Sequence, residues 1–140
     1  MSTAKQLVVM VENRVGRLAE VTGIIGEAGS NILGFSIAEG ENFGIVRFML
    51  DDLGSAYRLL KERGHTVSCT DVLAIPMEDR PGGLHEVSSR CGELGVNIVY
   101  AYAFRIGEGA VLVMKVDDLQ KSLRALKGAG FTTLSNDDLS

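Results

Sequence analysis

Apolar residues along the chain form two kinds of pattern, and the two follow each other in a regular order. Residues 7–11 and 72–77 are short continuous apolar runs, which are typical of buried strands. Each run precedes apolar residues at helical spacing, which are Leu18, Val21, Ile25 and Ala28 after the first and Leu84, Val87, Cys91 and Leu94 after the second. The pattern therefore predicts a strand and then a helix at two places.

The pattern after each of these helices is also shared. In the first half it predicts a strand at 31–39, a hairpin loop at 40–44, a strand at 45–50, a helix from 51 or 52 to 64 and a strand at 66–69. In the second half it predicts strands at 97–105 and 110–116 across a hairpin at 107–109, a helix from 117 or 118 to 128 and a strand at 131–133. The last residues, 135–140, are either an extra strand or a frayed end.

The two halves are copies of one another. An offset of 66 positions aligns Gly16 with Gly82 and Asn31-Ile32 with Asn97-Ile98, and about a third of the aligned residues are identical without a gap. We therefore expect two domains, residues 1–70 and 71–140, each with the order β-α-β-β-α-β. Right-handed crossovers then give an α+β fold of two ferredoxin-like units, each an antiparallel four-stranded sheet with both helices on one face.

A glycine turn joins the first strand of each copy to its first helix. Gly16 and Gly82 allow a positive φ, and the helix that follows presents unpaired N–H groups at the positive end of its dipole. Such a turn is suited to a carboxylate. Asn31 and Asn97 begin the second strand and offer donors and acceptors to an amino acid. The simpler alternatives are a tight turn that needs only glycine, and an asparagine in a left-handed turn.

The turn residues resemble the signature of ACT domains. The first copy reads Asn13-Arg14-Val15-Gly16-Arg17-Leu18 followed by Ser30-Asn31-Ile32, and the second reads Asp79-Arg80-Pro81-Gly82-Gly83-Leu84 followed by Val96-Asn97-Ile98. The resemblance implies a tandem ACT protein that binds amino acids between paired domains. It assigns ligand binding to Asn13, Arg14, Val15, Gly16, Leu18, Asn31 and Ile32 in one site and to Asp79, Arg80, Pro81, Gly82, Gly83, Leu84, Asn97 and Ile98 in the other.

The two copies differ beside the turn. Val15 stands where the second copy has Pro81, and Arg17 stands where it has Gly83. The aligned positions 34–36 and 100–102 also differ, and Tyr100 and Tyr102 lie on one face of their strand, where they line a pocket or an interface. We therefore expect the two sites to be inequivalent. Arg14 and Arg80 are either solvated, in contact with a ligand carboxylate, or paired with the nearby Glu12 and Glu78.

Charge, composition and residue spacing argue against several classes of function. A net charge of −4 argues against a nucleic-acid partner, and the chain has no apolar run long enough to cross a membrane and no signal-peptide pattern at its start. His65, His85, Cys69 and Cys91 show no ligand spacing, so we expect no metal and no cofactor, and a reduced cytoplasmic compartment. Cys91 aligns with Ile25 and is expected in the core.

The leading hypothesis is a non-enzymatic regulatory protein that binds a small amino acid and signals to a partner enzyme or regulator. Asp51-Asp52 and Asp117-Asp118 begin helices, so capping explains them better than catalysis. An RNA-binding module would carry stacked aromatics on its central strands, which these apolar runs lack. A structural assembly subunit without its own ligand is the main alternative. Because open sheets have unpaired edges, we expect a homodimer.

Overall fold

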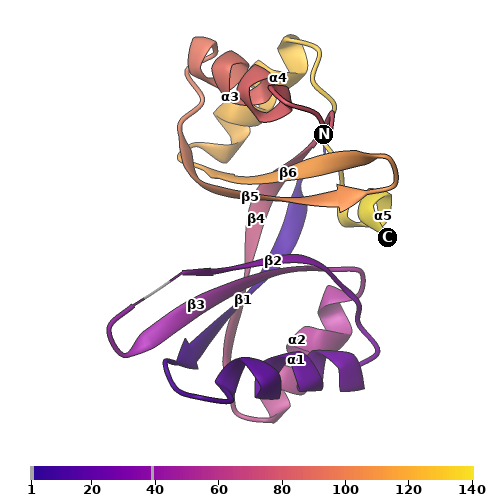
Figure 1. Ribbon diagram of the computed structural model, residues 1–140. Coiled ribbons are helices and arrows are strands. Elements are labelled where there is room, and N and C mark those ends of the chain that lie inside the picture. Colours follow the sequence, from indigo (N-terminus) through magenta and orange to yellow (C-terminus); the bar gives the residue numbers. More distant parts are fainter. Residues whose placement is uncertain (1, 39) are drawn as a thin grey trace. The chain divides into compact units, whose positions relative to one another are not determined.

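The computed structural model describes residues 2–38 and 40–140, so Met1 and Glu39, at the ends of two expected segments, lie outside the described residues. The chain folds as two compact units. One, the N-terminal unit, comprises Lys5–Thr70 together with Ser140. The other, the C-terminal unit, comprises Asp71–Leu139 together with residues 2–4. Figure 1 shows the elements of both.

The N-terminal unit contains the predicted order of strands and helices. Its elements are β1 (Ala4–Glu12), α1 (Arg17–Glu27), β2 (Ile32–Ala38), β3 (Phe43–Leu50), α2 (Leu53–Glu62) and the first part of β4 (Thr66–Met77). The strands lie in the order β2-β3-β1-β4, and β3 pairs antiparallel with both β1 and β2. Because the hairpin strand β3 begins at Phe43, the loop is shorter than the predicted 40–44.

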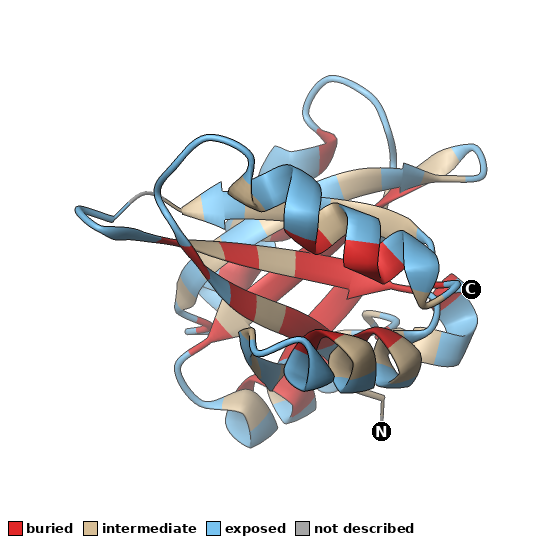
Figure 2. Ribbon diagram, turned by 90° about the horizontal axis from the view of Figure 1, so that it is seen from below, coloured by how far each residue is buried: buried red, intermediate tan, exposed pale blue. Residues whose placement is uncertain are grey.

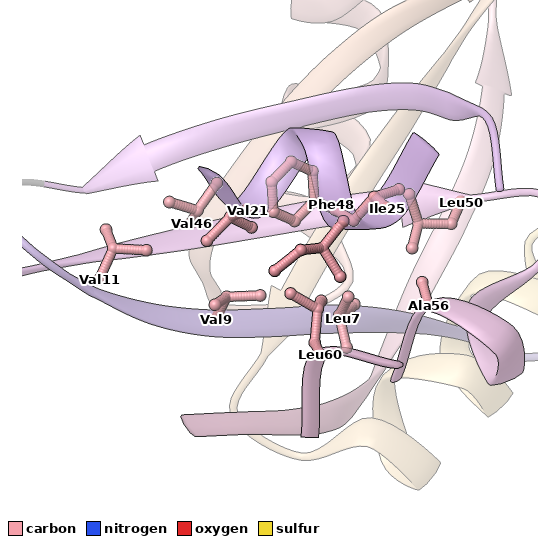
Figure 3. Close-up of a cluster of buried hydrophobic side chains, with 11 residues drawn as sticks. Leu7, Val9, Val11, Val21, Ile25, Val46, Phe48, Leu50, Ala56 and Leu60 are labelled. Atoms are coloured by element: carbon pink, nitrogen blue, oxygen red, sulfur yellow. The ribbon is translucent and has the colours of Figure 1, made fainter. Parts of the chain in front are cut away.

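Alternation along β1 and β3 builds the core of the N-terminal unit. Val9 and Val46 are opposite each other in the register, and both are fully buried. Figure 3 shows these strand residues meeting Val21 and Ile25 of α1 and Ala56 and Leu60 of α2. Leu18, which the helical spacing places on the apolar side of α1, is exposed at 36%. It therefore lies at the margin of the core.

The C-terminal unit repeats the arrangement with one strand fewer. It contains the second part of β4, then α3 (Gly83–Glu93), β5 (Ile98–Ile106), β6 (Gly109–Val116), α4 (Leu119–Gly128) and the short α5 (Asn136–Leu139). The strand order is β4-β6-β5, with antiparallel pairing. The core contains Val87, Leu112 and Leu126, and Cys91 is buried within it, as predicted. The predicted α+β class is confirmed by both units.

Three predictions about the strands and the tail are wrong. Residues 131–133 form no strand, and the backbone bond to the sheet beside them runs from the Leu134 N–H to the Ala74 carbonyl. The tail is neither a strand nor frayed. The Ser135 N–H donates to the Asp138 carboxylate at 2.8 Å, which begins α5 in a capping-box arrangement. The strands predicted at 66–69 and 72–77 are one continuous strand, β4.

In each aspartate pair, one residue caps a helix and the other aligns the start of a strand. The Asp52 side chain caps α2 by accepting from the Ser55 N–H, and Asp118 caps α4 in the same way. The preceding aspartate holds the start of the second strand, because the Asn31 N–H donates to Asp51 at 2.8 Å. The capping interpretation is confirmed for Asp52 and Asp118, whereas Asp51 and Asp117 accept hydrogen bonds from Asn31 and Asn97. Figure 2 shows buried residues concentrated on strands and inner helix faces and exposed residues in the turns.

Candidate functional site: the glycine turns and their cavities

Both glycine turns have the backbone geometry that only glycine adopts easily. Gly16 has a φ of 88° and Gly82 a φ of 86°, and each is the N-cap residue of its helix. Among the described residues, no side chain caps α1 or α3. The second and third N–H groups of α1, from Leu18 and Ala19, therefore point out of the first turn of the helix without a cap.

A cavity of about 270 Å³ adjoins the first turn. It lies within the N-terminal unit, between the turn, the start of α1 and the β2–β3 hairpin. Asn13, Arg14 and Leu18 line it from the turn and helix, and Ile37 and Ala38 line it from β2. The wall thus combines polar groups on the turn side with apolar side chains on the strand side, as small-molecule sites do.

The aligned positions of the second copy carry larger side chains. Ala38, Gly40 and Gly44, which line the first cavity, align with Phe104, Ile106 and Ala110. At these three positions the second copy therefore carries more side-chain volume than the first. The inequivalence of the two sites stays a prediction, which these replacements favour.

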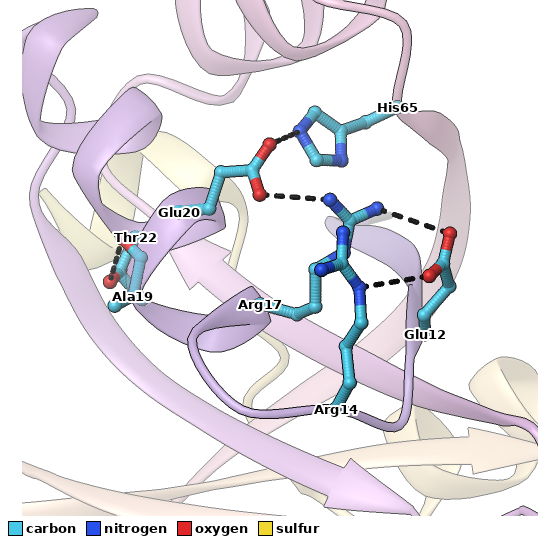
Figure 4. A network of polar contacts seen from close by, with 7 residues as sticks. All are labelled: Glu12, Arg14, Arg17, Ala19, Glu20, Thr22 and His65. Atoms are coloured by element: carbon cyan, nitrogen blue, oxygen red, sulfur yellow. Dashed lines mark hydrogen bonds and ion pairs between the residues drawn. The ribbon is translucent and has the colours of Figure 1, made fainter.

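A network of charged groups surrounds the start of α1, and Figure 4 shows its members. The Arg17 guanidinium donates to Glu20 at 2.8 Å and lies 3.8 Å from Glu12. The His65 ring is almost fully buried, and its Nε2 lies 3.4 Å from the Glu20 carboxylate. Arg14 donates to Glu12 at 2.9 Å, so pairing with the nearby glutamate is the correct alternative for this arginine.

In the second copy, a different arginine bonds to the two aligned glutamates. Glu78 and Glu86 align with Glu12 and Glu20, and both accept hydrogen bonds from Arg80. The bond that Arg80 donates to Glu78, and after it the bond to Glu86, raises the pKa of the Arg80 guanidinium. Arg80 aligns with Arg14, whereas Arg17 aligns with Gly83, which has no side chain to offer. In both copies the glutamate pair therefore has a guanidinium partner, which is Arg17 in the first copy and Arg80 in the second.

Asn31 and Asn97 do not lie beside the glycine turn of their own unit. Asn31 follows the C-terminal end of α1, an 11-residue helix about 16 Å long. It bonds through its N–H to Asp51 at the end of β3, and the Asn97 side-chain amide donates to Asp117 at 2.6 Å. Ile32 and Ile98 pack against the two cores. These residues align strands, and neither unit brings its own asparagine together with its own turn.

The remaining predicted residues are at or near the turn surfaces. Val15 is fully exposed, Leu84 is 53% exposed and Gly83 is buried. Asp79 pairs with Arg105 of β5 at 2.7 Å. Sequence reasoning did not select Ile37, Glu20 or His65, and the signal that could have found one of them was the recurrence of Glu20 as Glu86.

A family model described as an ACT domain pair matches residues 2–140. The chain belongs to the ACT domain family. Both ACT units carry the glycine turn expected from the resemblance, and no catalytic domain is evident in the part of the chain that the structure describes.

Solved structures agree with this assignment. The crystal structure of protein BT0572 from Bacteroides thetaiotaomicron is 35% identical, with a TM-score of 0.89 over 98% of this chain and 95% of that one. The ligand-free regulatory subunit of aspartate kinase from Thermus thermophilus shares the fold at 16% identity, with a TM-score of 0.62 over 93% of this chain and 94% of that one. A search of curated proteins found no match.

Neither a metal site nor a membrane-crossing helix is found among the described residues. Within residues 2–38 and 40–140, no group of three or more His, Cys, Asp or Glu side chains is placed to hold a metal ion. None of the described helices has the length and apolar character required to cross a membrane.

Proposed function

We propose that this ACT domain pair is a non-enzymatic regulatory protein that binds a small amino acid at ACT domain interfaces and signals its presence to a partner enzyme or regulator. The observation that carries the proposal is the uncapped, glycine-opened start of α1 beside a cavity of about 270 Å³. The fold shared with a regulatory subunit of aspartate kinase supports a regulatory role.

The groups around the first turn match the parts of an amino acid. The N–H groups at the start of α1 suit the α-carboxylate, whereas the guanidinium of Arg14 is already paired with Glu12. The side-chain oxygen of Asn13 is an acceptor for the ammonium group. Leu18 and Ile37 offer apolar contacts to a small side chain. A helix N-terminus, an acceptor and an apolar wall together favour a zwitterion over a simple anion.

In this proposal, each asparagine contacts a ligand that is bound at the glycine turn of another ACT unit. Because α1 separates Asn31 from Gly16 within a unit, a site that uses both groups takes them from two different ACT units. Asn31, Ile32, Asn97 and Ile98 are therefore proposed as contributions from the neighbouring unit. The second turn, with Asp79, Pro81, Gly82 and Leu84, is proposed as the weaker site, since larger residues surround it.

A thermal-shift screen of the twenty amino acids tests the proposal. A ligand that binds the native state raises the melting temperature by mass action. We expect one or a few small amino acids to do so, and titration calorimetry then measures their affinity. If no amino acid raises the melting temperature, the protein is an assembly subunit without a ligand of its own and the proposal is wrong.

Two glycine variants locate the site. Gly16→Asp places a carboxylate in the proposed anion position, and Gly82→Asp makes the same change in the second copy. Both glycines have a similar positive φ, and a β-carbon at either would have no described atom within 4 Å, so the folding cost is matched. We expect Gly16→Asp to weaken binding about tenfold or more and Gly82→Asp to weaken it less. If the two variants had equal melting temperatures and bound the amino acid with equal affinity, the assignment of the site to the first turn would be contradicted.

A further inference from the structure

A larger cavity in the C-terminal unit is not explained by the proposed amino-acid site. It has a volume of about 380 Å³ and lies between the end of β4, the first turns of α3 and the turn after α4. Glu78, Glu86 and Arg90 are its charged lining residues, and Val87 and Phe131 are among its apolar ones. Its wall is built from β4, α3 and the turn after α4, whereas the glycine-turn cavity of the first copy borders the β2–β3 hairpin.

In the first copy, an arginine side chain lies between the equivalent walls. Glu78 and Glu86 align with Glu12 and Glu20, between which the Arg17 guanidinium lies at 3.8 and 2.8 Å. In the second copy Gly83 replaces Arg17, so the carboxylates remain but that side chain does not. The cavity at the equivalent place in the first copy is lined by Arg17 and measures about 290 Å³. The space is therefore larger where the arginine is missing.

The backbone keeps this position free of a side chain. A side-chain carbon built on Gly83 would lie 2.2 Å from the Glu78 carbonyl oxygen, which is far inside van der Waals contact. Arg80 joins the two glutamates instead, but its side chain is 46% exposed and those of Glu78 and Glu86 are 72% and 58% exposed. Ion pairs at such exposed positions contribute little to stability, so a second cation can displace Arg80.

We propose that this cavity binds a guanidinium group carried on an aliphatic chain, as in free arginine. The guanidinium takes the place that Arg17 occupies in the first copy, between Glu78 and Glu86. The aliphatic chain packs on Val87 and Phe131, which line the cavity. Arg90 lies one helical turn after Glu86 on the same face of α3, where its guanidinium, which also donates to Glu93 at 2.8 Å, meets the α-carboxylate. This site is separate from the glycine-turn site of the proposed function.

Titration calorimetry with three probes tests the assignment. We expect L-arginine to bind once per chain, agmatine to bind more weakly because it lacks the carboxylate, and L-citrulline, which is isosteric but uncharged, to give no heat. Absence of arginine binding at millimolar concentration would overturn the inference, and so would equal binding of citrulline. The proposed function survives either result if another amino acid raises the melting temperature.

Matched variants place the ligand in this cavity. Glu86→Gln is expected to weaken arginine binding about tenfold or more, because it removes one charge-assisted partner from an exposed position. Glu20→Gln makes the same change in the first copy and is expected to leave the affinity unchanged. Arg80→Gln removes the competing cation and is expected to tighten binding.

Three results would overturn the assignment. They are an unchanged affinity in Glu86→Gln, a loss in Glu20→Gln as large as that in Glu86→Gln, and weaker binding in Arg80→Gln. The Gly16→Asp variant separates the two proposals, since it should retain arginine binding here. Loss of arginine binding in Gly16→Asp alone would assign arginine to the glycine turn and remove this site.

Discussion

Arg17 and Arg80 occupy different positions in the duplicated unit and neutralise aligned pairs of glutamates, Glu12 with Glu20 and Glu78 with Glu86. Their sequence context gives no sign of this, because Arg14 and Arg80 are the aligned pair and Arg17 has no counterpart. Pairing of Arg14 with Glu12 and of Arg80 with Glu78 is one of three alternatives that the sequence leaves open, and the structure contains both pairs. The longer reach of Arg80 to Glu86 depends on the folded turn, which is why the pattern alone does not predict it.

Two glycines of α3 should respond to alanine in opposite directions. A side-chain carbon at Gly83 would clash with the Glu78 carbonyl, whereas one at Gly92 would have no described neighbour within 4 Å. We expect Gly83→Ala to lower the free energy of unfolding by about 1–3 kcal/mol through backbone displacement. Gly92→Ala should raise it by about 0.5–1 kcal/mol because alanine favours the helix. Urea denaturation measures both, and a stabilised Gly83→Ala would contradict the geometry.

At the scale of elements, the helix starts and core strands could be predicted because local chemistry decides them. Gly16, Gly82, Asp52 and Asp118 each begin a helix where the sequence places one. Leu18 and Leu84 show the limit of periodicity, since both fit the apolar spacing and both are exposed. Spacing indicates a face of a helix, but the extent of the facing sheet decides how much of that face is covered.

The missing last strand has a local explanation. Residues 131–133 align with the start of β4, which predicts a strand by analogy. Ser135 and Asp138 form a capping box three residues apart, and this begins α5 in place of continued pairing. The Ser-x-x-Asp spacing was present in the sequence as a signal. The fate of Asn31 and Asn97 could not be predicted, because it depends on aspartates 20 residues away.

The α2 cap should give a pH-dependent contribution to stability. Hydrogen bonds from Ser55, that of its side chain first, hold the pKa of Asp52 below its ordinary value of 3.8. A carboxyl whose pKa is lowered by folding stabilises the native state above its unfolded pKa and loses this contribution as the pH falls through its folded pKa. Asp52→Ala should therefore lower the urea midpoint at pH 7 and differ less from the parent protein near pH 3.

An exposed carboxyl outside any cap is the control for this experiment. Glu41 lies exposed in the β2–β3 hairpin. Glu41→Gln should show a urea midpoint near that of the parent protein at every pH. A gap between Asp52→Ala and the parent that stays constant from pH 7 to pH 3 would show that the carboxylate charge contributes nothing to the cap.

At the scale of the molecule, each unit ends in an edge strand, and that of the N-terminal unit is apolar. β2 is the outermost strand in the order β2-β3-β1-β4. Phe35 and Ile37 of this strand are each 53% exposed, and both are paired with core residues of β3. An unpaired edge with apolar side chains favours association with another strand. The homodimer expected from the sequence stays a prediction, and this edge is where we expect the two copies to meet.

Sedimentation velocity tests the homodimer. We expect a dimer at micromolar concentration and a shift toward monomer for Ile37→Lys, because a charged side chain on an edge strand opposes pairing. Lys115→Glu changes a charge on β6, a strand that lies inside its sheet order, and should leave the dimer intact. A parent protein that sediments as a monomer would contradict the prediction.

The close approach of Gly83 to the Glu78 carbonyl also constrains how the duplicated gene can evolve. A side chain at position 83 would begin 2.2 Å from the Glu78 carbonyl oxygen, so a codon change that introduces arginine there also demands a displaced main chain. The first copy, in which Arg17 stands at the aligned position, is under no such demand. Descendants of the second copy can change the residues that surround the gap but cannot refill it from α3 without first moving the main chain.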